Sequence, residues 1–337
     1  MNLLEFTECA RPEIDREMRS ILDKNIPGNL GELRSMIAYH LGWEGDNAGP
    51  SVQGKRIRPL LVLLSNHAAK GNWREALPAA AAVEFVHNFS LIHDDIEDQS
   101  HYRHHRETLW SKWGIAQAIN TGDSMYTMSF DAILKLSNSY SPSMVIDAYQ
   151  ILIDSCTLLT QGQYLDIARQ SVSESAIGAY WPMIKGKTAS LIRACTELGA
   201  LTARANVERI KAFRTFGENL GMAFQVIDDY LGIWGSSEQT GKPSESDLVL
   251  GKKTLPILFG LQKKGAFAKR WVNGNIQAKE VQELSKMLVD EGAAEFTQHE
   301  ADRLTNEALA ALKEGAFDAF ERQPLEELAL KLLHRSY

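Results

Sequence analysis

The sequence predicts an all-α protein, and three observations support this prediction. Apolar residues between Val207 and Trp234 recur at steps of three and four, which places them on one face of a helix. Alternating runs of β-branched and aromatic residues, which would predict strands, are scarce. Of the 337 residues, 44% are hydrophobic and 23% are charged, an ordinary globular balance with ample material for a core. We therefore expect one all-helical domain over residues 1–337, with roughly ten or more helices.

Similar helical spacing marks most of the chain, and turn residues separate the helices. In order, the expected helices are Pro12–Ile26, Leu30–Leu41, Ile57–Ala69, Trp73–Asp98, Ile115–Leu136, Pro142–Gln161, Lys187–Ala203, Val207–Trp234, Asp247–Gln262 and Glu280–Glu321. Glycine, proline, asparagine and serine cluster at the breaks, which are Pro27–Asn29, Gly45–Asn47, Asn138–Pro142 and Gly235–Ser237. No Ser- or Pro-rich linker divides the chain, which favours a single domain.

Charge and cysteine content exclude some classes of function. The net charge of −7 gives no global basic field for nucleic acid, so no nucleic-acid partner is expected. Cys9, Cys156 and Cys195 lie far apart and lack the spacing of a metal site. We expect free thiols in a reducing compartment.

The sequence shows no leader peptide and no membrane span. Met1–Arg11 lacks the apolar run of a signal peptide. The most apolar stretch, Leu77–Ile92, is too short to span a bilayer and is interrupted by Glu84, His87 and Asn88. The simplest expected location is the cytoplasm.

A first acidic cluster follows this apolar stretch. Asp94 and Asp98 are four residues apart, so they share one helix face, with Asp95 beside them. Carboxylates this close repel one another unless a cation lies between them, and hard oxygen ligands suit Mg²⁺. A solvated acidic helix end remains the alternative for this cluster alone.

A second acidic pair, Asp228 and Asp229, lies 134 residues further along the chain and also follows an apolar helical segment. Buried paired carboxylates are costly unless they bind a partner. The alternative is a structural pair that is capped or bound to lysine. Two such helices facing one cavity would form a site for a metal and a diphosphate.

Basic turns could hold the phosphate groups of a ligand. Lys55, Arg56 and Arg58 precede an apolar helix, and Arg103 and Arg106 flank two histidines just after the first acidic cluster. Solvated helix starts and a polar loop are the alternatives. Two Gly-Lys-Thr-like turns, at 186–188 and 251–254, lack the upstream glycine of a nucleotide-binding P-loop.

The order and spacing of these segments resemble the trans-isoprenyl diphosphate synthases of the polyprenyl synthetase family. The resemblance covers about Gly54 to Leu261; Phe89–Asp98 resembles the family's first aspartate-rich motif and Phe224–Leu231 its second. It implies an all-α isoprenoid synthase fold, with helices around a central active-site cavity, and a homodimer.

The resemblance also implies roles for single residues. Asp94 and Asp98 correspond to ligands of two Mg²⁺ ions that bridge to an allylic diphosphate, with Asp95 supporting them. Asp228 corresponds to the ligand of a third Mg²⁺, with Asp229 nearby. The remaining correspondences are Lys55, Arg58, His87 and His104 for isopentenyl diphosphate, Arg103, Lys187 and Lys242 for the allylic diphosphate, and Thr188 and Gln225 beside the nascent carbocation.

The implied reaction elongates a prenyl chain. Diphosphate leaves the allylic substrate, the double bond of isopentenyl diphosphate attacks the resulting cation, and the released pyrophosphate is the base for the final proton. A dry site of Mg²⁺, lysine and arginine would stabilise the leaving group as its charge develops. The motif has no insertion, and Phe89 and Ser90 lie five and four positions before Asp94. This resembles the geranylgeranyl (C20) type. Without the ring of Phe89, Val86, Phe85 and neighbouring helices would set the new limit.

Two positions depart from the family pattern. His104 stands where the family has an arginine for isopentenyl diphosphate, and a neutral imidazole would hold that phosphate less well. Gly232 stands where the second motif has its fifth-position aspartate.

Other functions remain as alternatives. These are a farnesyl (C15) diphosphate synthase, a regulatory synthase subunit, a class I terpene cyclase and a metal phosphohydrolase that uses His93 and Asp94. The intact first motif argues against the subunit, and Asp228-Asp229 argues against the cyclase. No second histidine motif supports the phosphohydrolase.

Overall fold

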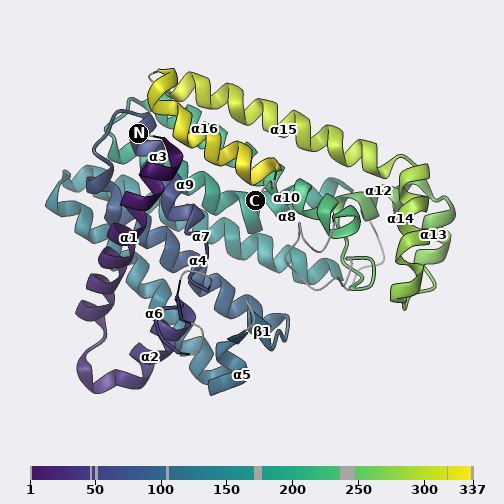
Figure 1. Cartoon of the computed structure of the whole chain (residues 1–337), viewed down its shortest axis with the longest axis horizontal. Coiled ribbons are helices and arrows are strands. Elements are labelled where there is room, and N and C mark those ends of the chain that lie inside the picture. The colour runs from purple at the N-terminus through teal and green to yellow at the C-terminus, as the bar shows by residue number, and fades with distance from the viewer. Residues whose placement is uncertain are drawn as a thin grey trace. The chain divides into compact units, whose positions relative to one another are not determined.

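The computed structural model describes residues 2–45, 48–49, 52–103, 106–170, 177–235, 247–316 and 318–334, and these are almost wholly helical (Figure 1). The predicted all-α class is therefore confirmed. Within these ranges, the only strands are β1 (Tyr102–Arg103) and β2 (Arg106–Glu107), which form a short antiparallel hairpin. The hairpin pairs Tyr102 with Glu107 and Arg103 with Arg106.

The helices follow the chain in a simple order. Their bounds are α1 (Leu3–Asn25), α2 (Gly31–His40), α3 (Ile57–Ala68), α4 (Leu77–Glu97), α5 (Leu109–Trp113), α6 (Ile115–Leu134), α7 (Pro142–Gln170), α8 (Tyr180–Ile184), α9 (Ser190–Thr202), α10 (Val207–Trp234), α12 (Leu255–Lys263), α13 (Ala266–Trp271), α14 (Val281–Asp290), α15 (Ala293–Gly315) and α16 (Ala319–His334). Within the described ranges, five short 3₁₀ turns connect some of them, and a π-helical turn, Lys185–Ala189, joins α8 to α9.

Contacts group the chain into two compact units. Unit 1 comprises Met1–Ile153, Ala194–Ile210 and Ala316–Leu325, and unit 2 comprises Asp154–Arg193, Lys211–Gly315 and Glu326–Tyr337. Four helices, α7, α9, α10 and α16, contribute residues to both units. The expectation of a single domain stays a prediction.

Helix α4 lies at the centre of unit 1. It packs against α1, α3, α5 and α6, and its residues Ala79–Val83, Phe85 and Val86 are fully buried. An alanine-rich surface lets neighbouring helices approach closely, and close packing restricts the direction of the side chains further along the helix. α4 therefore offers a rigid support for the acidic cluster at its end.

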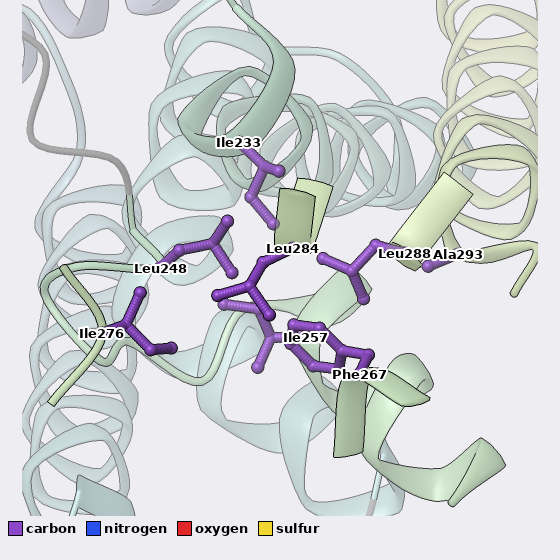
Figure 2. Packing of buried hydrophobic residues seen from close by; sticks show 8 residues of the cluster. All are labelled: Ile233, Leu248, Ile257, Phe267, Ile276, Leu284, Leu288 and Ala293. Atoms are coloured by element: carbon purple, nitrogen blue, oxygen red, sulfur yellow. The ribbon is translucent and has the colours of Figure 1, made fainter. Parts of the chain in front are cut away.

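Unit 2 has a core of its own, which Figure 2 shows from close by. The side chains of Ile233, Leu248, Ile257, Phe267, Ile276, Leu284, Leu288 and Ala293 converge from α10, α12, α13, α14, α15 and the loops between them. This cluster fixes the C-terminal end of α10, just beyond the second acidic pair.

Several predicted helix boundaries were wrong, among them the end of α7, which lies at Gln170 and not at Gln161. α1 begins at Leu3 and not at Pro12, because Asn2 and Glu5 form a reciprocal capping box and the apolar face already starts with Leu3. α12 begins at Leu255 and not at Asp247. The segment expected as one helix over 280–321 is divided into α14 and α15 at Gly292, whose φ of +85° is left-handed.

The three cysteines form no disulfide, as predicted; Cys156 and Cys195 are buried and Cys9 is exposed. Across the described ranges, no helix combines the length and the apolar character needed to cross a bilayer.

Candidate active site

The first predicted acidic motif lies at the C-terminal end of α4, in unit 1. Asp94 is partly exposed and Asp98, one turn later, is exposed. The Asp98 amide donates to the Asp94 carbonyl oxygen at 2.8 Å, so the helical register continues to this point. The two carboxylates therefore begin on one helix face, as predicted.

Asp95 has a different environment from its neighbours. Its side chain is only 2% exposed, and its Oδ1 accepts a hydrogen bond from Arg103 Nε on β1 at 2.9 Å. Arg103 Nη2 lies 2.8 Å from the same oxygen and completes the ion pair. The side chain is thus turned into the protein, and the pair holds the hairpin against α4. Arg103 in turn has a fixed guanidinium beside the acidic motif.

A cavity of about 530 Å³ opens beside this ion pair. Its wall comes from the end of α2, the segment leading into α3, the middle of α4 and the hairpin. Four side chains that were predicted to bind phosphate groups line this cavity, namely Lys55, Arg58, His87 and Arg103, and Asp95 lines it with them. The structure therefore brings together residues from positions 55 to 103 of the sequence.

Arg58 and His87 are in direct contact. Arg58 Nη1 lies 3.0 Å from His87 Nε2. Burial, reinforced by the positive charges of Arg58 and Arg103, lowers the pKa of His87 well below its usual value. The imidazole is therefore neutral at pH 7, and its Nε2 accepts the hydrogen bond while Nδ1 carries the proton. Burial also lowers the pKa of Arg58, whose buried Nε has no hydrogen-bond partner among the described residues.

Two further arginines in the cavity wall bind other groups of the protein. Arg56 Nη1 lies 2.7 Å from Glu84 Oε1, and both side chains are at most 5% exposed. Arg106 donates to the carbonyl oxygens of Tyr39 at 2.9 Å and of Glu44 at 2.8 Å. These bonds tie α3, α4 and the hairpin together around the cavity.

Sequence reasoning missed some of the lining, namely Tyr39, His40, Gln53, Glu84 and Asn88. Glu84 carried a signal, because it is a charged residue within the most apolar stretch of the chain. A buried charge there requires a partner, and Arg56 is that partner. His40 carried no such signal, since it ends an ordinary amphipathic helix.

The second acidic pair lies on α10, in unit 2. Asp228 is partly exposed, whereas Asp229 is 4% exposed. Asp229 accepts hydrogen bonds from Tyr180 Oη at 2.7 Å, Gln225 Nε2 at 2.9 Å and the Leu255 amide at 3.0 Å. Burial nevertheless raises the pKa of Asp229 to about 7. Asp229 is thus directed into unit 2 and holds Gln225 and the start of α12.

Gln225 links this carboxylate to the predicted Thr188. Thr188 Oγ1 donates to Gln225 Oε1 at 2.7 Å, so Thr188, Gln225 and Asp229 form one chain of hydrogen bonds. Thr188 and Gln225, the two groups predicted to flank the carbocation, are thus in direct contact. The Gln225 side-chain nitrogen donates to Asp229, and this bond orients the Gln225 side-chain oxygen towards Thr188.

Lys187 is held in the π-helical turn. Its Nζ lies 2.5 Å from Asp166 Oδ2 on α7. A Cβ added to Gly162 of α7 would lie 2.0 Å from the Lys187 amide nitrogen, so only glycine allows the backbones to approach this closely. Asp166 and Gly162 carried no signal that sequence reasoning could use.

The predicted chain-length residues lie on α4. Phe89 is partly buried, and its ring centroid is 4.8 Å from those of both His93 and Tyr126. Ser90 donates to the His87 carbonyl oxygen at 2.8 Å, and Val86 is fully buried. Two further predicted residues, His104 and Lys242, lie outside the described residues.

The donor set suits Mg²⁺ in part. Among the described residues, no group of three or more His, Cys, Asp or Glu side chains could hold an ion by protein atoms alone. Mg²⁺ does not require such a group, because it usually takes one or two carboxylates and completes its shell with water and phosphate oxygens. Asp94 and Asp98 on successive turns provide that number of hard oxygen ligands.

Comparison with known proteins agrees with this geometry. The polyprenyl synthetase family model matches residues 48–290. A (2E,6E)-farnesyl diphosphate synthase of Mycobacterium tuberculosis is 38% identical over 263 residues, covering 77% of this chain and 71% of the relative. A geranylgeranyl diphosphate synthase of the same species is 35% identical over 301 residues, covering 87% and 85%.

Solved structures show the same fold. A geranylgeranyl pyrophosphate synthetase from Pyrococcus horikoshii superposes with a TM-score of 0.89 at 28% identity, covering 99% of this chain and 98% of the other. A polyprenyl synthase from Caulobacter crescentus, complexed with calcium and isoprenyl diphosphate, has a TM-score of 0.82 at 28% identity, with coverage of 100% and 98%. The predicted isoprenoid synthase fold is confirmed, and the chain belongs to the polyprenyl synthetase family.

Proposed function

We propose that this chain is a short-chain prenyl diphosphate synthase that condenses isopentenyl diphosphate with an allylic diphosphate. The observation that carries the proposal is the α4 site, where Asp94 and Asp98 share a face next to a cavity lined by Lys55, Arg58 and Arg103. Carboxylates that bind a cation, adjacent to fixed cations, suit a substrate that carries a diphosphate. The family match and the relatives' activities support it.

Each group has a role in the proposed reaction. The C1–O bond of the allylic substrate breaks and C1 bonds to C4, the terminal alkene carbon of isopentenyl diphosphate, which leaves a cation at C3. The proton lost from C2, as the new C2=C3 double bond forms, goes to the departing pyrophosphate. Lys55, Arg58 and neutral His87 would bind the diphosphate of isopentenyl diphosphate. Arg103, Lys187 and Lys242 would bind the allylic diphosphate, and Thr188 and Gln225 would present oxygen dipoles to the allylic cation.

The family is magnesium-dependent, and a calcium ion accompanies isoprenyl diphosphate in the Caulobacter relative. We assign two Mg²⁺ ions to Asp94 and Asp98 and a third to Asp228. These ions would stabilise the negative charge of the leaving diphosphate. Three ions, a homodimer and a cytoplasmic location are parts of the proposal.

The proposed main product is C20 geranylgeranyl diphosphate, and C15 farnesyl diphosphate is the second candidate. Phe89 with small Ser90, and no insertion between Asp94 and Asp98, favours C20. Relatives with either product resemble the chain at 38% and 35% identity, so overall similarity does not separate the two.

The test is to incubate the pure protein with Mg²⁺, isopentenyl diphosphate and each of the C5, C10 and C15 allylic diphosphates, and to size the dephosphorylated products. Asp94→Ala and Asp228→Ala should reduce turnover by several orders of magnitude with an unchanged far-ultraviolet circular dichroism spectrum, because each removes a cation ligand. Asp290→Asn, an exposed carboxylate on α14, is the control. Wild-type turnover in folded Asp94→Ala contradicts the proposal. Hydrocarbon products made from the allylic substrate alone would instead indicate a cyclase.

A further inference from the structure

The space beside Gly232, where a side chain would lie, is occupied by a residue from outside α10. Gly232 lies four residues after Asp228 on α10, so a side chain there would start one turn further along the same face. A Cβ added to Gly232 would lie 2.0 Å from Asp247 Oδ2 and 2.8 Å from Asp247 Cγ. The carboxylate of Asp247 therefore takes the space in which a side chain at position 232 would begin.

Backbone bonds hold Asp247 in this place. Its amide donates to the Gly232 carbonyl oxygen at 3.2 Å, and its own carbonyl oxygen accepts from the Lys252 amide at 3.1 Å. The Asp247 side chain is 17% exposed. Its side-chain ion pair with Lys252 is long, at 3.8 Å, and Lys252 is 55% exposed, so solvent screens that attraction.

The glycine itself needs an explanation. Glycine within a helix destabilises it by about 0.5–1 kcal/mol relative to alanine. At position 232 any side chain would displace the Asp247 carboxylate, because the contact distance is far below van der Waals separation. The Asp247 carboxylate can therefore keep its position only because residue 232 has no side chain.

We infer that Asp247 supplies the third carboxylate of the second acidic motif, in place of the aspartate that Gly232 lacks. It acts together with Asp228 on the divalent cation that the proposed function assigns there, and the inference rests on that function. The carboxylate comes from a different segment, but its Oδ2 lies where the Cβ of a side chain at position 232 would begin. Hard oxygen donors beside a ligand raise metal affinity even when they act through water.

A purely structural role for Asp247, in anchoring the turn after residue 247, is the competing explanation. Asn at this position keeps the shape and the backbone bonds but removes the charge. A structural role predicts that Asp247→Asn has normal cation binding. A role at the cation predicts weaker binding in a protein of unchanged stability.

The experiment measures Mn²⁺ binding to the full chain by electron paramagnetic resonance, with inorganic pyrophosphate present. The relevant ions are those whose binding is lost in Asp228→Asn. We expect the Kd for these ions to rise by about 10-fold or more in Asp247→Asn and in Gly232→Ala. Asp290→Asn, which removes an exposed carboxylate elsewhere in unit 2, should bind as wild type.

A reciprocal exchange tests the replacement directly. Gly232→Asp alone should weaken binding, because its Cβ collides with the Asp247 carboxylate. Combined with Asp247→Ala, which removes the colliding atoms, Gly232→Asp should restore the Kd to within about threefold of wild type. Normal binding in Asp247→Asn, or no recovery in the folded double variant, overturns the inference.

The two proposals fail in different ways. Absence of any Mn²⁺ binding in wild type with pyrophosphate, or no loss in Asp228→Asn, would overturn the proposed cation site and this inference with it. Binding that depends on Asp228 but not on Asp247 would overturn this inference alone.

Discussion

At the scale of single residues, Asp95 and Asp229 share an arrangement. Each stands next to a predicted cation ligand, yet each is buried and bound by the protein, Asp95 by Arg103 and Asp229 by Tyr180, Gln225 and the Leu255 amide. Successive helical residues differ in direction by about 100°, so only one of two adjacent carboxylates can face a given ligand. The other carboxylate positions the groups around it.

Phe89 is the residue on which product length should depend. Phe89→Ala should extend the products beyond C20, because it removes the large ring five positions before Asp94. The lost packing against His93 and Tyr126 should also destabilise the protein, by about 2–3 kcal/mol. Chromatography of dephosphorylated products is the measurement. Phe259→Ala, which removes a ring that is stacked on Phe296, controls for destabilisation. An unchanged product in folded, active Phe89→Ala would show that Phe89 does not set the product length.

His40 should make stability depend on pH. Burial, with the charges of Arg103, Arg56 and Arg106, lowers its pKa to about 3. Below the unfolded-state pKa of about 6.5, the unfolded chain binds a proton at His40 that the folded chain does not bind. The contribution of this group to stability is therefore fully present above that pH and falls as the pH decreases towards 3. This group should lower the free energy of unfolding by about 2 kcal/mol between pH 7.5 and pH 5.

The measurement is urea unfolding at the two pH values. His40→Gln should shrink the difference between them by about that amount. His87, whose pKa is also lowered, should contribute in the same direction and remain in the variant. His299→Gln, at an exposed position on α15, controls for the loss of an imidazole. An equal pH difference in wild type and His40→Gln would show that His40 is protonated in the folded protein.

At the scale of elements, the π-helical turn Lys185–Ala189 depends on glycine. Gly162→Ala would place a Cβ 2.0 Å from the Lys187 amide nitrogen, so α7 and the turn must separate. We expect a loss of about 1–3 kcal/mol in stability and a lower kcat, since Lys187 and Thr188 move with the turn. Thermal unfolding and steady-state kinetics measure the two effects. Gly178→Ala, with no atom within 4 Å of the added Cβ, is the matched control, and equal behaviour of the two variants would refute the prediction.

Long helices could be predicted from sequence, whereas short elements could not. Val207–Trp234 was predicted to the residue, because eight apolar positions define its period. α5, α8 and α13 have five or six residues each, too few to establish a period, and the β1–β2 hairpin has two residues in each strand. The residue types at the candidate site were predictable for a similar reason: they stand in long motifs. The direction of each side chain was not, because it depends on partners such as Asp166 and Arg103 that are distant in sequence.

At the scale of the whole molecule, the fold class and the family were predictable, since both rest on patterns that extend over most of the chain. The division into two compact units could not be predicted from the sequence, because each unit is assembled from three separate segments. Composition cannot reveal a boundary that the chain crosses several times. Four helices cross it without interruption.

These continuous helices predict cooperative unfolding. Because α7, α9, α10 and α16 each belong to both units, loss of one unit should unravel helices that the other needs. We expect one transition in urea, with coincident midpoints by tryptophan fluorescence and far-ultraviolet circular dichroism. Tryptophans report from both units, for example Trp73 and Trp271. Two separated transitions would show that the units are independent domains.

The neutral histidines of the unit 1 cavity bear on how its substrate arrives. Over the part of the wall that the structure describes, five lysine and arginine side chains face three carboxylates, and neither histidine adds charge at pH 7. The field that attracts a polyanion from solution therefore comes from groups whose charge is constant over the physiological range. Such a field is weakened by dissolved electrolyte, which at 0.1 M screens exposed charges beyond about 10 Å. Capture of diphosphates by this wall should thus weaken as the ionic strength of the medium rises.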